Sequence, residues 1–486
     1  LENSTKGIVV SQYEMEAAEE VGLVKIDLLG QRSLSIVDEA ARSVERNHGV
    51  ELHLYDLPDR DERTARILRH GRTMGCFQIE SPGMRQLLQM LQAGSIMDVI
   101  QGLSLIRPGP SSSGMKDAFI NRCRGEEPVT YRTPRMEEAL ADTYGVMLYQ
   151  EDILKVAQTV AGFSLAEGDQ LRKRITKERS AEALAEMKDR FIGGATARGV
   201  ATGLAEQIWH EIEGFAAYSY CKAHATTYGH ISYQATWLKA RWPAEFIASV
   251  IANKAGFYDA GTYYRDARRF NVEILPPSIN ASGAQCQPEP PPKGKRRPGG
   301  IRPGLESVRA LRKRTIDRML EERGRAPFES LEDFCARVPC RDQELENLVL
   351  GGAFDWTGKS RPTLMMKLEL RDKAVFGADG EQGDGLFAAQ SLPSVIRESA
   401  PVYEVPEQEE FSLAERVRWE LHVLGMTHSG HPLDAWGGDL DERGLTRSYQ
   451  LRERVGRRVV FVGWLVMMRR AVTHEQNYMK FLCLED

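Results

Sequence analysis

The sequence predicts a mostly α-helical protein of several domains, an α+β multidomain architecture with few strands. Its 486 residues exceed what one hydrophobic core usually organises, so about two to four domains are expected. Between residues 60 and 255, apolar residues mostly recur at helical spacing, with interruptions at Gly and Pro. Residues 457–486 instead read as the two strands of a hairpin, and such a hairpin needs further strands as partners.

Composition argues against several classes of protein. With 42% hydrophobic and 27% charged residues, and no apolar run approaching the roughly 18 residues of a membrane span, we expect a soluble protein of the cytoplasm. The 7 cysteines include no Cys-x-x-Cys pair, which disfavours a zinc ribbon or a disulfide framework. There is no G-x-x-x-x-G-K-[ST] phosphate loop and no G-x-S-x-G nucleophile elbow.

The first 50 residues predict two strands and one helix. The strands are GIVVSQYEM and the apolar run around Asp27. The helix covers 33–48, with Ser33 or Ser35 as its N-cap and Gly49 as its stop.

Later helix boundaries are marked by capping residues and by proline. Ser81 precedes Pro82, Pro243 breaks a long amphipathic segment, and Ser412 with Glu415 forms a capping box. The helix QEDILKVAQTVAGFS is expected to bury one face, made by Ile153, Val156, Ala157 and Val160.

The segment 285–304, QCQPEPPPKGKRRPGGIRPG, differs in composition from its surroundings. Pro, Gly, Lys and Arg dominate it, so we expect an exposed loop or linker that contributes nothing to a core.

Asp27 stands out as a carboxylate within the apolar run GLVKIDLLG. Burying an unpaired carboxylate is costly, so it must be paired or bind a metal. In a strand, Lys25 and Asp27 point to the same side, so an ion pair between them would suffice. A metal site for two Mg²⁺ ions would need further carboxylates, and both readings stay open on these residues alone.

Basic residues cluster although the net charge is −5. The clusters at 171–179, 293–297 and 309–314 could hold phosphates. Each is equally compatible with a solvated helix face.

Three further segments have chemistry suited to nucleotides or DNA. LSLIRPGPSSSGM joins Arg107 to a rigid turn with exposed amides, which suits phosphate but also an ordinary turn. FAAYSYCKAHATTYGHISY gathers Lys222, His224 and several Tyr, which suits a nucleotide or a helix start with a satisfied His. ENLVLGGAFDWTG ends a helix at Gly351 and Gly352, whose exposed N–H groups could grip a phosphate or simply stop the helix.

Nine motifs in sequence order resemble the alpha subunit of bacterial DNA polymerase III, a C-family polymerase. They are GLVKIDLLG, GCFQIESPGMRQLL, LIRPGPSSSGM, YGVMLYQEDILKVAQ, LRKRITKE, KAHATTYGHISYQATWLKARWPAEF, ILPPSIN, LVLGGAFD and LGMTHSGHPLD. The resemblance runs from about residue 8 to the end.

The resemblance implies a role for each candidate residue. Asp27 matches the last of three palm aspartates that hold two catalytic Mg²⁺ ions, and Lys25 a lysine that contacts the incoming triphosphate. The residues implied to face nucleotide and template are Arg107, Arg172, Lys173, Lys222 and His224. Those implied to bind DNA are Arg312, Lys313, Arg314, Gly351 and Gly352. The segment QGDGLF resembles a sliding-clamp tether, with contacts from Gln382, Asp384, Leu386 and Phe387.

The resemblance also implies a division into domains. We expect a palm remnant at 1–35, helical fingers at 36–284, the basic linker at 285–304, a helix-hairpin-helix region at 305–358, a connector with the clamp motif at 359–455 and part of an OB-fold at 456–486.

Departures from the family pattern concern the first hairpin and the chain ends. RALRKR replaces the usual Gly-x-Gly turn, so side-chain charge would have to grip phosphate there. The PHP domain, thumb and two other catalytic aspartates would lie before Leu1. We therefore expect part of a DNA polymerase, acting with primed DNA, dNTPs, a sliding clamp and other replisome subunits, and inactive as this piece alone. The alternatives are a non-catalytic DNA- and clamp-binding module, or a helical scaffold unrelated to DNA.

Overall fold

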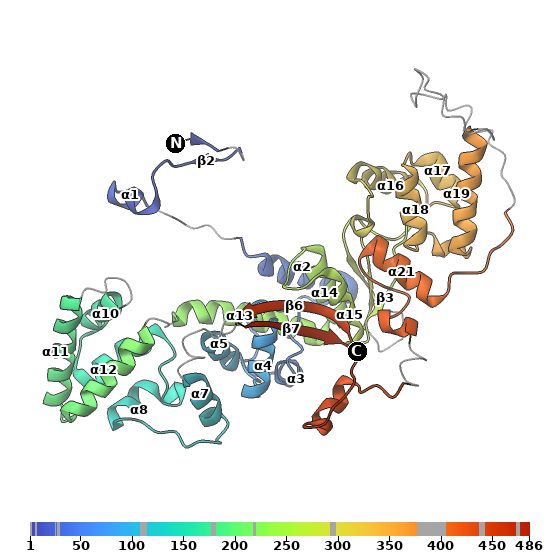
Figure 1. Ribbon diagram of the computed structural model, residues 1–486. Helices are drawn as coiled ribbons and strands as arrows, with labels where there is room; N and C mark the ends of the chain where they lie inside the picture. Colours follow the sequence, from blue (N-terminus) through green and yellow to red (C-terminus); the bar gives the residue numbers. More distant parts are fainter. Residues whose placement is uncertain are drawn as a thin grey trace.

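A computed structural model describes most of the chain (Figure 1). The residues it does not describe are 1, 5–6, 25, 27–29, 107–113, 176–180, 217–219, 292–297, 377–404, 437–442 and 473–476. The described part is mostly helical with small sheets, which confirms the predicted fold class.

A central group of helices surrounds the larger hydrophobic core (Figure 1). Its members are α2 (Arg32–His48), α3 (Glu62–Arg69), α4 (Pro82–Leu91), α5 (Ile96–Leu105), α7 (Met115–Cys123), α13 (Lys222–Arg241), α14 (Pro243–Ala252) and α15 (Ala260–Arg268). Helix α13 packs against α3 and α5, and α14 packs against α2. The 20-residue α13 thus forms the long axis of this group.

Local sequence signals set several of these boundaries. Helix α2 ends at Gly49, which has a φ of 67°, a conformation that glycine adopts without strain. The Ser81 side chain accepts a hydrogen bond from Met84 N and caps α4 as predicted. The predicted break at Pro243 is confirmed, because α13 ends at Arg241 and α14 begins at the proline. The N-cap of α2 is Gln31, not a serine.

A second, separate core lies within α8 (Pro134–Leu140), α9 (Gln150–Ala161), α10 (Leu165–Lys173), α11 (Ala181–Ala197) and α12 (Thr202–Ala216). Figure 1 shows this group beyond the N-terminal end of α13. Four residues of α9 are fully buried in it, which confirms the predicted face: Ile153, Val156, Ala157 and Val160.

A three-stranded sheet connects the central helices to the following region. It consists of β3 (Glu273–Ile274), β4 (Gln287–Glu289) and β5 (Gly300–Arg302) in the order β3-β5-β4. Strand β3 is parallel to β5, and β4 is antiparallel to it.

The expectation of an exposed linker over 285–304 is wrong at both ends of that segment. They form β4 and β5, and Ile301 is fully buried. The physical reason is strand pairing at very close range. A Cβ on Gly299 would lie 2.0 Å from the carbonyl oxygen of Glu289, so the glycine that looked like a loop signal permits β-pairing. The basic residues 292–297 lie outside the described part.

The next helices form a compact group at the right of Figure 1. They are α16 (Lys313–Arg325), α17 (Leu331–Arg337), α18 (Asp342–Leu350), α19 (Arg361–Phe376) and α21 (Leu413–Leu424). Helix α18 packs against α19 and α21. The predicted capping box of α21 is confirmed, because Ser412 and Glu415 exchange side-chain to backbone hydrogen bonds.

The two ends of the chain carry short β-pairs. At the start, β1 (Glu2–Asn3) pairs with β2 (Val9–Val10), followed by α1 (Met15–Glu20). The expected strand over GIVVSQYEM is therefore only partly formed. The predicted terminal hairpin is confirmed as β6 (Trp464–Val472) antiparallel to β7 (Tyr478–Glu485).

Candidate nucleotide and DNA interfaces

The N-termini of α9 and α13 meet, although Glu151 and Lys222 are 71 residues apart in sequence. Tyr149 and Tyr220 form a β-bridge, and Gln150 N donates to Tyr220 O at 2.9 Å. The Glu151 carboxylate accepts from Lys222 N at 2.9 Å. A carboxylate from one helix therefore satisfies a free amide at the start of the other.

The buried Asp152 side chain stabilises the start of its own helix, α9. Its carboxylate accepts from Leu148 N and Tyr149 N, both at 2.8 Å. Burial raises the pKa of Asp152 to about 6, although these backbone donors and the nearby Lys155 and Lys222 oppose the rise. The start of α9 is thus held by a buried carboxyl group whose pKa lies well above the usual value for aspartate.

Lys222 and His224 project from the first turn of α13 among aromatic rings. The Lys222 ammonium lies 5.3 Å from the centre of the Tyr149 ring, which is within cation–π range. The exposed His224 ring lies 5.4 Å from the Tyr220 ring and 4.1 Å from the Tyr228 ring. A cation and several aromatic rings therefore lie together at the start of α13.

Arg172 joins the same place from α10. It donates to Asp169 Oδ1 at 2.8 Å and to Gln150 Oε1 at 3.4 Å. Because Gln150 is the first residue of α9, this contact connects Arg172 to the junction of α9 and α13. The exposed Lys173 also contacts Asp169, at 2.8 Å. The structure thus gathers Arg172, Lys222 and His224 around one junction.

Other predicted site residues lie outside the described part of the chain. They are Lys25, Asp27, Arg107, Gln382, Asp384, Leu386 and Phe387. Within the described residues, no group of three or more His, Cys, Asp or Glu side chains could hold a metal ion. Near Asp27, Val24 is 83% and Ile26 is 73% exposed, so these two apolar neighbours do not pack as buried strand residues would.

Arg312, expected to bind DNA, forms an ion pair inside the fold. Its guanidinium Nε and its backbone N both donate to Glu344 Oε1 at 2.9 Å. Burial raises the pKa of Glu344, but hydrogen bonds from Arg312, Arg341 N and Thr315 hold it at about 2. Lys313 and Arg314 are exposed at the start of α16, and Lys313 also forms a surface ion pair with Asp317 at 3.2 Å.

The turn of the first hairpin has a left-handed backbone conformation, which glycine usually adopts, at an alanine. Ala310, at the place of the family's Gly-x-Gly, has a φ of 62°. This left-handed conformation costs a non-glycine residue roughly 1 kcal/mol. The turn is fixed by Arg309 N, which donates to Val423 O at 2.9 Å, and by Leu311 N, which donates to Val308 O.

The expectation that Gly351 and Gly352 offer exposed N–H groups is wrong. Both residues are buried, and their amides donate to Asn347 O and Val349 O at the end of α18. Their role is to allow close packing. Gly352 has a φ of 89°, and a Cβ there would lie 2.6 Å from Arg361 Nη2.

A buried polar network holds this turn to α19 and α21. The fully buried Arg361 donates to Asp355 Oδ2 at 2.9 Å and to Glu420 Oε1 at 3.3 Å. His428 N donates to Glu420 Oε2 at 2.9 Å. Burial lowers the pKa of His428, and the neighbouring Glu420 opposes this. The motif THSGH, residues 427–431, thus stabilises the hairpin turn through the Glu420 carboxylate.

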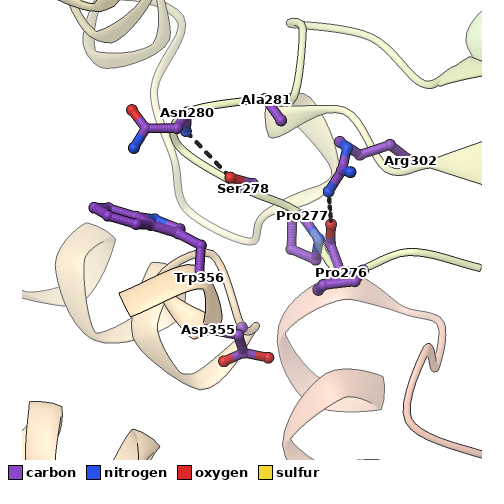
Figure 2. A pocket seen from close by; sticks show the side chains of 9 residues that line it. Pro276, Pro277, Ser278, Asn280, Ala281, Arg302, Asp355 and Trp356 are labelled. Atoms are coloured by element: carbon purple, nitrogen blue, oxygen red, sulfur yellow. Dashed lines mark hydrogen bonds between the residues drawn. The ribbon is translucent and has the colours of Figure 1, made fainter. Parts of the chain in front are cut away.

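A shallow pocket opens where this turn faces the sheet, as Figure 2 shows. Pro276 and Pro277 lie across from Trp356, which is 40% exposed. Arg302 Nη1 donates to Pro276 O at 2.8 Å. The Asn280 side-chain amide donates to Phe328 O and accepts from Phe328 N. The residues around this pocket therefore serve mainly to hold the turn and the sheet together.

The fold and these sites define a mostly helical protein built around a helix-hairpin-helix motif. Residues 271–364 match the family model of that motif. Residues 33–199 match the finger domain of the bacterial DNA polymerase III alpha subunit.

Curated relatives carry the name DNA polymerase III subunit alpha. The relative from Aquifex aeolicus (strain VF5) is 37% identical over 433 residues, which cover 88% of this chain and 35% of the relative. The relative from Thermus aquaticus is 36% identical over 498 residues, covering 99% and 39%. That from Bacillus subtilis (strain 168) is 32% identical over 492 residues, covering 100% and 42%.

The chain belongs to the family of bacterial DNA polymerase III alpha subunits. It spans between 35% and 42% of the length of these three relatives. Among the helices that the structure describes, none has the length and apolarity needed to cross a bilayer.

The sequence reading missed the residues that hold the site together. Tyr149, Glu151 and Asp152 arrange the junction of α9 and α13. One signal was available, because acids at the start of a predicted helix commonly cap N-termini. Nothing local indicated that Glu151 serves a helix 71 residues away.

Proposed function

We propose that this chain forms the nucleotide-binding fingers and DNA-gripping region of a template-directed DNA polymerase that extends primed DNA with dNTPs. The observation that carries the proposal is the junction of α9 and α13. There Lys222 is held over Tyr149, His224 contacts the rings of Tyr220 and Tyr228, and Arg172 contacts Gln150.

The chemistry of this junction suits a deoxynucleoside triphosphate. Ammonium and guanidinium groups attract phosphate oxygens, and aromatic rings stack on a base. The Lys222 side chain is half-buried and its backbone amide is bonded to Glu151, so its position is fixed before any ligand arrives. A preorganised cation loses less conformational entropy when it binds phosphate.

The catalytic part of the proposal rests on the order of sequence motifs. We assign Asp27 as one ligand of the catalytic Mg²⁺ ions and Lys25 as a contact of the triphosphate. A bound pair of such ions would stabilise charge on the attacking and leaving oxygens. The resemblance places two companion aspartates before Leu1, so a polypeptide limited to these 486 residues is proposed to lack polymerase activity.

The remaining partners are also proposals. QGDGLF, with Gln382, Asp384, Leu386 and Phe387, would dock on a sliding clamp by placing its two apolar side chains in a pocket. The protein would act in the cytoplasm with other replisome subunits. Exposed Lys313 and Arg314 would contact duplex phosphates.

The test compares Lys222→Ala and His224→Ala with Lys254→Ala. Lys254 is 74% exposed and pairs with Glu306, so it is a matched surface control. With primed DNA and Mg²⁺, we expect Lys222→Ala to weaken dNTP binding about tenfold, as the loss of one charge-assisted contact would. His224→Ala should weaken it less, and Lys254→Ala should leave it within about twofold.

Equal binding by Lys222→Ala and the Lys254→Ala control would contradict the assignment of the junction. Primer extension by the unmodified chain above the background of a mock preparation would contradict the proposed inactivity of this piece. Failure of the unmodified chain to retain primed DNA at low salt would favour a scaffold unrelated to DNA.

A further inference from the structure

A second basic site lies at the other end of α13. A pocket of about 410 Å³ opens between α3, the turn that follows it and the end of α13. Its lining consists of Arg63, Arg66, Ile67, His70, Arg72, Ala240 and Phe270. At 1.5 Å per helical residue, Ala240 lies about 24 Å from His224. This pocket is therefore separate from the junction of α9 and α13.

The three arginines of the pocket have no carboxylate partner among the residues that the structure describes. Arg63, Arg66 and Arg72 are exposed, and none forms a side-chain hydrogen bond or ion pair with any residue that the structure describes. On a protein of net charge −5, three guanidinium groups around one hollow are a local excess of positive charge.

Three nearby carboxylates each form an ion pair with a cation outside the three pocket arginines. Asp61 pairs with Arg241 and Glu62 with Arg69. Asp266 is buried and pairs with Lys239 at 2.7 Å. These three acids are thus paired with other cations, and the charge of the pocket arginines is left for a ligand.

The geometry of the pocket suits grouped phosphates. Arg63 and Arg66 are three residues apart on α3 and His70, the C-cap residue, follows four residues later, so the three share one face. His70 Nδ1 bonds to Arg66 O at 2.7 Å, which fixes the ring and leaves Nε2 available. The turn after α15 adds Phe270, whose ring already contacts the Lys239 ammonium at 4.8 Å.

We propose that this pocket binds two or more phosphates held close together. The shared chemistry is a compact polyanion, for which the planar donors of arginine are well matched. Its source is either a free polyphosphate group or consecutive phosphates of a single-stranded nucleic acid. The proposal concerns α3 and is independent of whether Lys222 binds dNTPs.

The experiment uses the whole chain without divalent metal at about 50 mM salt. Tripolyphosphate binding is measured by calorimetry and binding of a labelled twelve-residue oligo-dT by anisotropy. The pocket variant is Arg63→Gln with Arg66→Gln, because glutamine retains helix propensity. The control is Arg42→Gln with Arg132→Gln, which removes the same charge from side chains that are 73% and 56% exposed.

The pocket variant is expected to bind at least one probe tenfold or more weakly, while the control stays within twofold. Loss of tripolyphosphate binding identifies a free polyphosphate ligand. Loss confined to oligo-dT identifies a strand, and the slope of log affinity against log salt should then fall by about 1.4 for two lost phosphate contacts.

Two results would overturn the proposal. One is an equal effect of the pocket and control variants on both probes. The other is the absence of binding of either probe by the unmodified chain. If the double variant does not fold, as judged by circular dichroism, Arg72→Gln tests the same pocket from outside the helix, with the same expected loss.

Discussion

At the scale of single residues, two buried acids near helix starts have pKa values shifted in opposite directions. Neither their charge nor their hydropathy in the sequence predicts this difference. Asp152 is 2% exposed and has two backbone donors, whereas Glu344 is 1% exposed and has an arginine. The pKa of Asp152 is raised to about 6 and that of Glu344 is lowered to about 2. Burial raises both, and in Glu344 the hydrogen bonds from Arg312, Arg341 N and Thr315 reverse the direction.

The raised pKa of Asp152 predicts a pH dependence of stability. The folded carboxyl binds a proton more readily than the unfolded one, so its contribution to stability is largest at low pH and decreases as pH rises through about 6. Between pH 5 and 7 we expect a decrease of about 1 kcal/mol in the free energy of unfolding. Asp152→Asn keeps an acceptor and should remove this decrease.

Urea denaturation of both proteins at pH 5 and pH 7 measures the difference. The two proteins share all other titrating groups. The difference between their changes in unfolding free energy from pH 5 to pH 7 therefore isolates the contribution of Asp152. Parallel pH profiles would show that Asp152 is ionised throughout this range.

At the scale of elements, glycine decides how closely helices approach. Gly229 lies where α13 crosses α5, and a Cβ there would be 2.4 Å from Ile100 Cγ1. Gly214 in α12 faces open space, with no atom within 4 Å of a Cβ. The two glycines have the same intrinsic effect on a helix but different surroundings.

Gly229→Ala is therefore expected to destabilise the chain by about 1–3 kcal/mol, because the crossing must separate. Gly214→Ala should be neutral or stabilise by up to about 1 kcal/mol through helix propensity. Thermal unfolding followed by circular dichroism compares the pair. A stabilising Gly229→Ala would mean that Ile100 can rotate away without cost.

Contacts between helices also fix the α9–α13 junction and the hairpin turn. Glu151 caps a helix other than its own, and Arg361 holds the turn at Gly352 against α21. In the first contact a carboxylate accepts a hydrogen bond from a free backbone amide, and in the second a guanidinium group pairs with a buried carboxylate. Such contacts can be stable only after the helices have assembled.

At the scale of the whole molecule, a net negative chain presents separated basic surfaces. One lies at the α9–α13 junction, one at the start of α16 and one in the pocket beside α3. Phosphate binding by such surfaces releases counterions and is therefore sensitive to salt.

Duplex binding should weaken steeply as salt rises if Lys313 and Arg314 contact phosphates. Replacing both with glutamine is expected to reduce the slope of log affinity against log salt by about 1.8, from roughly 0.9 per contact. Filter binding between 50 and 200 mM salt provides the slopes. A variant with Arg42→Gln and Lys254→Gln should retain the original slope, and an equal reduction there would indicate a non-specific charge effect.

Sequence reasoning succeeded where a signal is local. Gly49, Ser81, Pro243 and Ser412 set helix boundaries through their own backbone or side-chain chemistry. It failed at 285–304, where Pro and Gly suggested a loop but strand pairing depended on a partner elsewhere. The N-cap of α2 was also misplaced, by two residues or more.

Part of the candidate site could also be found from the sequence. The segment with Lys222 and His224 was identified from its residue types alone, and the structure surrounds it with the aromatic rings expected there. The role of Gly351 and Gly352 could not be found, because burial of a turn depends on what covers it. Arg312 looked free because its partner, Glu344, follows 32 residues later.

The sequence by itself determined the helical class, most helix ends and the family, because these depend on periodicity, capping and ordered motifs within short stretches. Only the tertiary structure decided which charges are available. Arg312, Arg361 and Lys239 are held by buried acids, whereas Arg63, Arg66 and Arg72 have no acid partner in the described part of the chain. Pairing of charges is a long-range property of the packed chain, and it separates an arginine that stabilises the fold from one that can bind a ligand.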